Sequence, residues 1–226
     1  MKVSIVIPVY NEFPTFGQVL ERVRRAPLPA GCVKEIVVID DGSTDGTAQL
    51  LGPERHVISH AGKGSAIRAG IQLATGDIVL IQDGDLEYDP NDYARLLEPI
   101  VSGQADIVYG SRFLGQPVAM PLANRIANRI LTAAANLLYR AQLTDEATAY
   151  KAFRTSVLRG IHLECRRFEF CPEVTAKARR LGFSIHEVPV SYNARGIAEG
   201  KKIRARDGWE ALWTLLRYRF APRARL

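Results

Sequence analysis

The sequence predicts an α/β protein with a mostly parallel central sheet and helices on both faces of that sheet. Four short runs rich in β-branched residues alternate with segments whose apolar residues recur at helical spacing. Each run is almost continuously apolar, which is typical of strands covered on both faces. Alternating strands and helices pair in parallel through right-handed crossovers, so this order predicts one doubly covered sheet.

The individual elements follow from these patterns in chain order. Strands are predicted over residues 3–10, 35–40, 77–83 and 106–111. The helices between and after them are predicted over residues 15–25, 44–51, 64–74 and 92–101. From about residue 116 the pattern changes to a long helix (121–142), a polar loop (143–150), the segment 151–161, a helix (172–182), a strand (184–192) and a last helix (207–220).

Length, composition and charge limit the possible classes of protein. The 226 residues, of which 47% are hydrophobic, suit a single domain with one sizeable core. The apolar start is too short for a signal peptide, and no stretch is long enough to span a bilayer, so we expect a cytosolic protein. The net charge of +6 arises entirely from residues 195–226, which hold nine Lys and Arg against three Asp and Glu. A membrane surface, a phosphorylated ligand or nucleic acid could attract such a segment.

Polar residues follow each of the first three predicted strands. These strand ends read Tyr-Asn-Glu at 10–12, Asp-Asp-Gly-Ser at 40–43 and Asp-Gly-Asp at 83–85. In an open α/β sheet, ligands bind at the carboxyl ends of the strands. We therefore expect the three polar segments to line one ligand crevice.

The third strand end, IQDGDLEYDP at 81–90, concentrates carboxylates that repel one another unless a cation is present. A divalent cation prefers carboxylate oxygens and completes its shell with water and substrate phosphates. Asp83, Asp85 and Glu87 are therefore candidate ligands of Mg²⁺ or Mn²⁺. The alternative is an acidic surface turn, and we expect residues 89–92 to cap the next helix in either case.

Two glycine-containing loops are candidate phosphate or nucleoside contacts. In DDGSTDGT, Asp40 or Asp41 could accept hydrogen bonds from a base or ribose, whereas Thr44 and Asp45 could simply cap a helix. HAGKGSAIRAG fits neither the Walker nor the dinucleotide-binding pattern. Lys63 could still approach a phosphate at the start of the helix, and a flexible loop entering a helix is the alternative.

Three arginines complete the candidate site. Arg112 follows the fourth predicted strand, and Arg125 and Arg129 lie one turn apart on the long helix. Like charges at that spacing cost free energy unless an anion bridges them, although a solvated helix face is equally compatible.

Together these motifs resemble the inverting family 2 glycosyltransferases, which have the GT-A, Rossmann-like fold. VSIVIPVYNE, VVIDDGSTDGT and IQDGDLEYDP resemble the opening strand, the second motif and the DxD metal motif of that family. GKGSAIRAG, YGSRF, TAYKAF and NARGIAEGKKI, taken with QDGDLEYDP, are most similar to the dolichyl- and polyprenyl-phosphate hexose synthases, which include mannosyltransferases. The likeness runs from residue 3 to about residue 210.

The resemblance implies roles for individual residues. Nucleotide-sugar contacts are implied for Pro8, Tyr10, Glu12, Asp40, Asp41, Lys63, Asp83, Gly84 and Asp85. Asp83 and Asp85 match the metal ligands, and Glu87 matches a frequent third ligand. Arg112, with Arg125 or Arg129, matches residues facing the acceptor phosphate. Arg195 and Lys201 match the loop that closes over the donor diphosphate.

The implied reaction is metal-dependent transfer of a hexose, mannose or glucose first, from GDP-mannose or UDP-glucose to a polyprenyl phosphate. Such an acceptor is already anionic and needs positioning cations rather than a strong base. A hydroxyl acceptor, on a glycan or a protein, would need a general base, for which Asp145 is the candidate. A nucleotidyltransferase is a further alternative. Nucleic acid is not expected, because the aromatic residues of the basic segment lie at core-like helical spacing.

The resemblance also divides the chain. Within one domain, 1–226, it predicts a nucleotide-sugar-binding half (1–115), an acceptor-binding half (116–206) and a basic amphipathic helix (207–226). Trp209, Trp213 and Phe220 lie on one face of that helix, which could contact an anionic membrane on the cytosolic side or pack on the core. Two positions depart from the pattern: Gly84 replaces a more usual alanine with little expected effect, and Ala149 replaces a common glycine.

Overall fold

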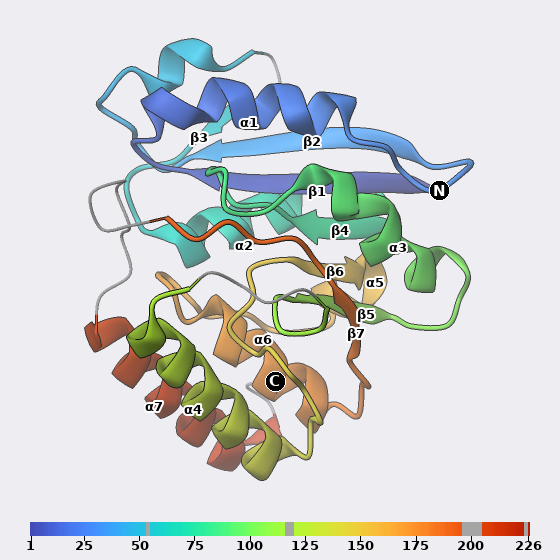
Figure 1. The fold of residues 1–226 in the computed structure, drawn as a ribbon, viewed down its shortest axis with the longest axis vertical. Coiled ribbons are helices and arrows are strands. Elements are labelled where there is room, and N and C mark those ends of the chain that lie inside the picture. The colour runs from blue at the N-terminus through green and yellow to red at the C-terminus, as the bar shows by residue number, and fades with distance from the viewer. Residues whose placement is uncertain (53–54, 116–119, 196–204, 224–225) are drawn as a thin grey trace.

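The sheet of this protein is built around β1 (Lys2–Val9), with β2 (Val33–Asp40) on one side and β4 (Ile78–Ile81) on the other. The computed structural model describes residues 1–52, 55–115, 120–195, 205–223 and 226 (Figure 1). The first four predicted strands are present, and the fourth is β5 (Ile107–Ser111). They form because continuous apolar β-branched runs can be buried on both faces at once.

Within the described residues, seven strands pair in the order β3-β2-β1-β4-β6-β5-β7. The three strands not yet given are β3 (Arg55–Val57), β6 (Lys151–Arg154) and β7 (His186–Pro189). β6 runs antiparallel to both of its neighbours, β4 and β5, and every other pairing is parallel. The prediction of a mostly parallel sheet is therefore confirmed.

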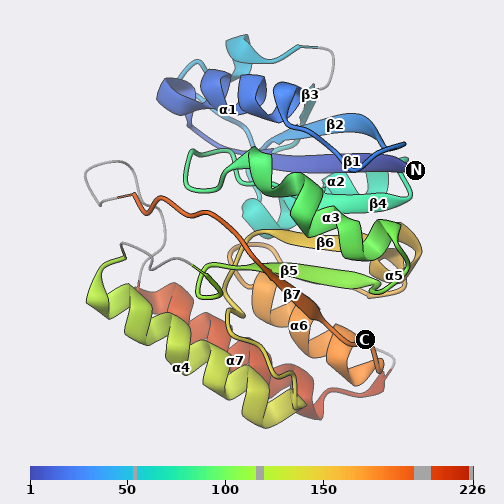
Figure 2. The same cartoon turned by 45° about the vertical axis from the view of Figure 1, so that its right-hand side comes forward.

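Helices cover the two faces of the sheet with separate hydrophobic clusters. One cluster contains the buried sides of α1 (Phe13–Arg25) and α3 (Tyr93–Val101). The other contains those of α2 (Lys63–Leu73), α4 (Leu122–Tyr139) and α6 (Phe170–Arg180), together with α5 (Thr155–Arg159) and α7 (Ala205–Phe220). Figure 2 shows α4, α6 and α7 together on their side of the sheet.

The predicted helix over residues 44–51 is wrong, because only a short 3₁₀ turn, η1 (Thr47–Leu50), forms there. Gly42 and Gly46 adopt left-handed backbone angles, and the Asp45 carboxylate accepts hydrogen bonds from the backbone N–H and hydroxyl of Thr47 and from the N–H of Phe13. These side-chain contacts satisfy the backbone locally and compete with helix formation.

The amphipathic helix α7 packs on the protein with a face other than the predicted aromatic one. Leu215 and Tyr218 are buried against α4 and α6, and the Tyr139 hydroxyl of α4 donates to the Leu215 carbonyl. Trp209, Trp213 and Phe220 point outward, with 75%, 66% and 81% of their surface exposed. Helix α7 therefore packs on the core with one face and presents aromatic side chains to solvent on another.

Candidate active site

The carboxyl ends of β2, β1 and β4 lie side by side because these parallel strands are neighbours in the sheet. Hydrogen bonds join the first two ends: the Ser43 hydroxyl accepts from the N–H of Asn11, and the Asn11 side-chain oxygen accepts from the N–H of Thr44. The three polar segments predicted from the sequence therefore meet at the end of the sheet where these strands finish.

Asp41 holds a neighbouring loop against this end of the sheet. Its buried carboxylate accepts hydrogen bonds from the N–H groups of Ala61 and Gly62, at 2.7 and 2.9 Å, and lies 2.9 Å from Nδ1 of His60. The His60 ring in turn stacks on Tyr10, with ring centroids 4.2 Å apart. Asp40 is also buried and accepts from the N–H of Ser43 at 2.9 Å.

The acidic segment after β4 meets the guanidinium of Arg195. Asp85 Oδ2 lies 2.5 Å from Nη2, Glu12 Oε2 lies 3.1 Å from Nη1, and Glu87 Oε1 lies 3.9 Å from Nε. Glu87 Oε1 also accepts from the Arg195 backbone N–H at 2.9 Å. The predicted metal ligands Asp85 and Glu87 thus share one cation with Glu12.

The charges in this cluster shift the pKa of Asp85. Burial, followed by the nearby carboxylates Asp83 and Glu87, raises that pKa to about 7, although Arg195 opposes the shift. Asp83 is paired with Lys63 of α2, whose Nζ lies 2.5 Å from Oδ1. Burial disfavours the charged lysine, but the charge of Asp83 outweighs it and raises the pKa of Lys63. The lysine is therefore a fixed positive charge beside the acidic segment.

A divalent cation fits the chemistry of these residues if the substrate supplies part of its shell. Within the described ranges, no group of three or more His, Cys, Asp or Glu side chains could hold a metal ion by itself. Asp83 Oδ1 is a buried, hard oxygen donor that faces the Lys63 ammonium at 2.5 Å, so this oxygen already lies against a positive charge. One or two carboxylates plus phosphate oxygens are a usual Mg²⁺ environment. Asp83, Asp85 and Glu87 remain predicted ligands.

Gly84, between the two aspartates, lies closer to β1 than expected. A Cβ at this position would be 3.2 Å from the carbonyl oxygen of Pro8 and 3.3 Å from a methyl group of Val9. An alanine here would require small movements of β1, and the expectation that glycine at this position has little effect stays a prediction.

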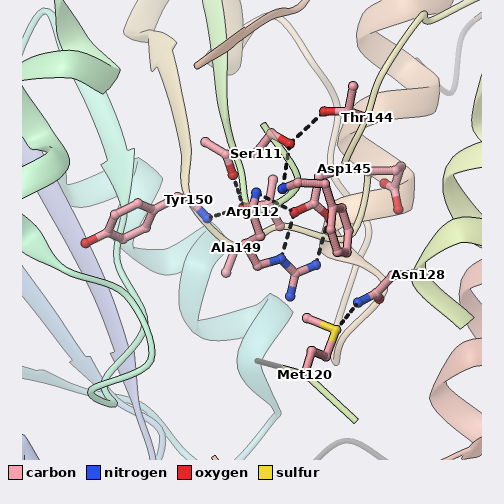
Figure 3. A network of polar contacts seen from close by, with 12 residues as sticks. Ser111, Arg112, Met120, Asn128, Thr144, Asp145, Ala149 and Tyr150 are labelled. Carbon is pink, nitrogen blue, oxygen red and sulfur yellow. Dashed lines mark hydrogen bonds and ion pairs between the residues drawn. The ribbon is translucent and has the colours of Figure 1, made fainter. Parts of the chain in front are cut away.

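Arg112 and Asp145 form a buried ion pair beside β5 (Figure 3). Nε and Nη2 of Arg112 donate to the two carboxylate oxygens at 2.7 and 2.8 Å, and the Arg112 backbone N–H donates at 3.0 Å. The guanidinium also lies 5.0 Å from the ring centroid of Tyr192. The predicted phosphate contact and the predicted general base are thus engaged with each other.

Arg125, Arg129 and Lys201 are the remaining predicted basic residues. Arg125 and Arg129 are exposed on the N-terminal half of α4, which both views place toward the side where β1, β2 and β4 end. Lys201 lies outside the described residues.

Comparison with known proteins decides the family. The sequence model of the protein family described as Glycosyl transferase family 2 matches residues 4–161. This chain is a family 2 glycosyltransferase. Undecaprenyl-phosphate mannosyltransferase of Micrococcus luteus is 31% identical over 99% of this chain and 96% of its own length.

Two archaeal relatives are longer than this glycosyltransferase. Dolichol-phosphate mannosyltransferase of Pyrococcus furiosus is 30% identical over 89% of this chain, and glycosyltransferase AglJ of Haloferax volcanii is 32% identical over 85%. The chain spans 59% and 63% of their respective lengths.

Solved structures confirm the GT-A fold of the glycosyltransferase. Glucosyl-3-phosphoglycerate synthase from Mycobacterium tuberculosis, in complex with UDP, superposes with a TM-score of 0.75 at 23% identity, covering 98% of this chain and 81% of that one. A second structure of that synthase, with Mn²⁺, UDP-glucose and phosphoglyceric acid, gives a TM-score of 0.74 at the same identity, covering 98% of this chain and 80% of that one.

Sequence reasoning did not identify two polar groups near the candidate site. The first is His60, whose contacts with Asp41 and Tyr10 join residues distant in sequence. The buried pair Glu146 and Lys151 was also missed. Lys151 Nζ donates to the Glu146 carbonyl and lies 3.4 Å from the ring centroid of Tyr109, while burial raises the pKa of the Glu146 carboxyl to about 7. A charged pair inside one short motif, TDEATAYKAF, was the available signal.

Proposed function

We propose that this family 2 glycosyltransferase transfers a hexose, mannose or glucose, from GDP-mannose or UDP-glucose to a polyprenyl phosphate. The observation that carries the proposal is an exposed apolar surface on α4 and α7 beside the arginines of α4. Relatives named for undecaprenyl-phosphate and dolichol-phosphate mannosyl transfer support the acceptor class.

This surface, called here the α4–α7 face, suits a lipid-linked acceptor. Its members are large apolar side chains that each expose 44% or more of their surface: Leu122, Ile126, Ile130, Leu137, Trp209, Trp213, Leu216 and Phe220. Apolar and basic residues together on neighbouring helices favour the interface of an anionic membrane. Among the described residues, no helix is long and apolar enough to cross a membrane. We propose peripheral contact on the cytoplasmic side.

The strand-end cluster supplies the donor side of the reaction. Asp83 and Asp85 would hold Mg²⁺ or Mn²⁺, which when bound neutralises charge on the departing nucleoside diphosphate. Tyr10, Asp40 and Asp41 lie at the neighbouring ends of β1 and β2 and would contact the nucleoside. Lys63 and Arg195 add fixed positive charge within reach of the acidic segment and would stabilise the diphosphate as it leaves.

The Arg112–Asp145 pair supports a phosphate acceptor over a hydroxyl acceptor. A hydroxyl must lose a proton as it attacks, whereas a phosphate monoester is already a nucleophilic anion. Asp145 is fully buried and accepts three hydrogen bonds from Arg112, which favours its role as an anchor for that arginine rather than as a base. Arg125 and Arg129 would then orient the acceptor phosphate for attack opposite the leaving group.

Radiolabelled transfer tests the proposal. Purified protein is incubated with GDP-[¹⁴C]mannose or UDP-[¹⁴C]glucose, Mn²⁺ and either polyprenyl phosphate or soluble glycans. Label should move into the lipid fraction with polyprenyl phosphate, and Asp85→Ala should abolish that transfer. Asp89→Asn is the matched control, because Asp89 accepts a hydrogen bond from the Asn91 N–H at the start of η2 (Pro90–Asp92). Label found only on glycan, or release of inorganic diphosphate from a nucleoside triphosphate, would contradict the proposal.

A further inference from the structure

The guanidinium of Arg195 lies where carboxylates from two strand ends converge. Glu12 follows β1, and Asp85 and Glu87 follow β4, and all three approach this one group within 3.9 Å. Its side chain is only 15% exposed, so solvent screens these charges weakly. Without a cation here, the three carboxylates would repel one another across a partly buried space.

The charge of the whole cluster is not balanced by arginine and lysine. Four carboxylates, of Glu12, Asp83, Asp85 and Glu87, face two cationic side chains, Lys63 and Arg195, so carboxylates outnumber cations in this cluster. These carboxylates can therefore bind a further cation, because Arg195 and Lys63 do not neutralise all of them.

Arg195 is also an imperfect occupant of this position. Its Nε is buried and makes no hydrogen bond with any described residue. The Glu87 carboxylate lies 3.9 Å from Nε, beyond hydrogen-bonding distance. A buried donor without a partner lowers the stability of the ion pairs that Arg195 makes here. Another cation can therefore replace the guanidinium without breaking a full set of hydrogen bonds.

The backbone around Arg195 is held independently of its guanidinium. The Arg195 N–H donates to Glu87 Oε1, the Asn193 N–H donates to the Glu87 carbonyl, and Tyr192 forms a bridge and an edge-on ring contact with Tyr88. Figure 1 shows this segment lying across the strand-end edge of the sheet. Rotation of the side chain alone can therefore remove the guanidinium from the carboxylates while the main chain stays in place.

We propose that, before the donor binds, Arg195 pairs with Asp85 and Glu87, two of the carboxylates that the divalent cation engages when the nucleotide sugar arrives. Metal and guanidinium then compete for the same carboxylate oxygens, and the donor diphosphate gives the displaced guanidinium a new anionic partner. Metal and nucleotide consequently bind with positive coupling, and metal alone binds weakly. This inference rests on the proposed function, because it assumes a nucleoside diphosphate at the strand ends.

Mn²⁺ binding without any turnover tests the exchange. Free Mn²⁺ is measured by electron paramagnetic resonance with the wild type and with Arg195→Gln, each with and without GDP or UDP. In the absence of nucleotide, Arg195→Gln should bind Mn²⁺ at least about tenfold more tightly than the wild type, since a competing positive charge within 4 Å has been removed. In the wild type, GDP or UDP should strengthen Mn²⁺ binding, and this coupling should be smaller in Arg195→Gln.

Two further variants make the result specific. Arg154→Gln removes a comparable arginine that pairs with Asp106 at 2.9 Å, beside the start of β4 at the opposite end of the sheet, and it should leave Mn²⁺ affinity unchanged. Adding Asp85→Asn to Arg195→Gln should abolish the gained affinity, because the metal would lose a carboxylate. Thermal unfolding of each variant, followed by circular dichroism, confirms that the fold is retained.

The outcomes separate this inference from the proposed function. If Arg195→Gln binds nucleotide-free Mn²⁺ no more tightly than the wild type, while nucleotide still strengthens Mn²⁺ binding to the wild type, the exchange is refuted and the proposed function stands. If Mn²⁺ binds to no variant, with or without GDP or UDP, both are refuted.

Discussion

Arg112 and Asp145 are bound to each other through two side-chain hydrogen bonds and one from the Arg112 backbone, and the two side chains are 7% and 0% exposed. The pair joins the end of β5 to the loop between α4 and β6. Glu187 of β7 extends this link, because its carboxylate accepts from the N–H groups of Thr144 and Asp145. The buried charge pair and Glu187 thus connect three segments of the chain: the end of β5, the loop before β6, and β7.

Removing Asp145 should destabilise the protein strongly. Asp145→Ala leaves the Arg112 guanidinium buried without its partner, for which a loss of about 3–5 kcal/mol in the free energy of unfolding is expected. Urea denaturation measures this loss. Glu21→Ala removes the exposed ion pair with Arg25 on α1 and should change stability by less than about 1 kcal/mol. Equal losses in the two variants would contradict the structural importance of the buried pair.

The buried carboxyl of Glu146 should make stability depend on pH. Its pKa is raised from 4.5 to about 7, chiefly by burial, with Lys151 opposing the shift. Between these two values the folded state holds a proton that the unfolded state has released, so stability falls as pH rises from about 4.5 to 7. The loss attributable to Glu146 is on the order of 3 kcal/mol.

Glu146→Gln is the matched variant for this dependence. The isosteric amide cannot ionise, so the stability difference between variant and wild type should grow in favour of the variant as pH rises from 5 to 7. Urea unfolding at pH 5, 6, 7 and 8 measures the difference. The titrations of Lys151, Cys171 and Asp85 are common to both proteins and cancel to first order. A difference independent of pH would show that Glu146 is ionised throughout this range.

The arginines of α4 should affect the acceptor more than the donor. Arg125→Ala or Arg129→Ala removes a charge-assisted contact with the acceptor phosphate, for which about a tenfold rise in the KM for polyprenyl phosphate is expected. The KM for the nucleotide sugar should change little. Steady-state kinetics with each substrate varied in turn measure both constants, and Arg22→Ala, an exposed arginine of α1, serves as the control. A larger rise in the donor KM would move the arginine to the nucleotide side.

Tryptophan fluorescence should reveal contact between the α4–α7 face and lipid. Trp209 and Trp213, the two tryptophans of the chain, both belong to it. Vesicles containing phosphatidylglycerol should shift tryptophan emission to shorter wavelength, and brominated lipids should quench it. Phosphatidylcholine vesicles or high salt should weaken the effect, because part of the attraction is electrostatic.

A charge placed on this face should weaken that contact. Leu216→Glu introduces a carboxylate among the exposed apolar residues and should reduce binding to anionic vesicles in a flotation assay. Val33→Glu places the same charge at another exposed apolar position, at the start of β2, and should bind as the wild type does. Equal binding by all three proteins would exclude this face as the lipid contact.

The sequence predicted those parts of the fold that depend on local pattern. Four strands and the helices α1, α2 and α3 appear close to their predicted positions, because apolar periodicity records burial directly. The four residues of β6 carry no signal of direction, so its antiparallel pairing with β4 and β5 could not be foreseen. The strand-end site was predictable because it follows from topology. The partners within it were not, since Arg195 and Asp85 are 110 positions apart.

The position of β6 between β4 and β5 means that the two predicted halves of the chain are interleaved. A fragment ending at residue 115 would contain β4 and β5 without the strand that joins them, and the long edge of β4 would be left without a partner. The strands of residues 1–115 therefore form a continuous sheet only when β6, which comes from the second predicted half, lies between β4 and β5. Exchange of modules between enzymes of this architecture would have to cut within the sheet rather than between domains.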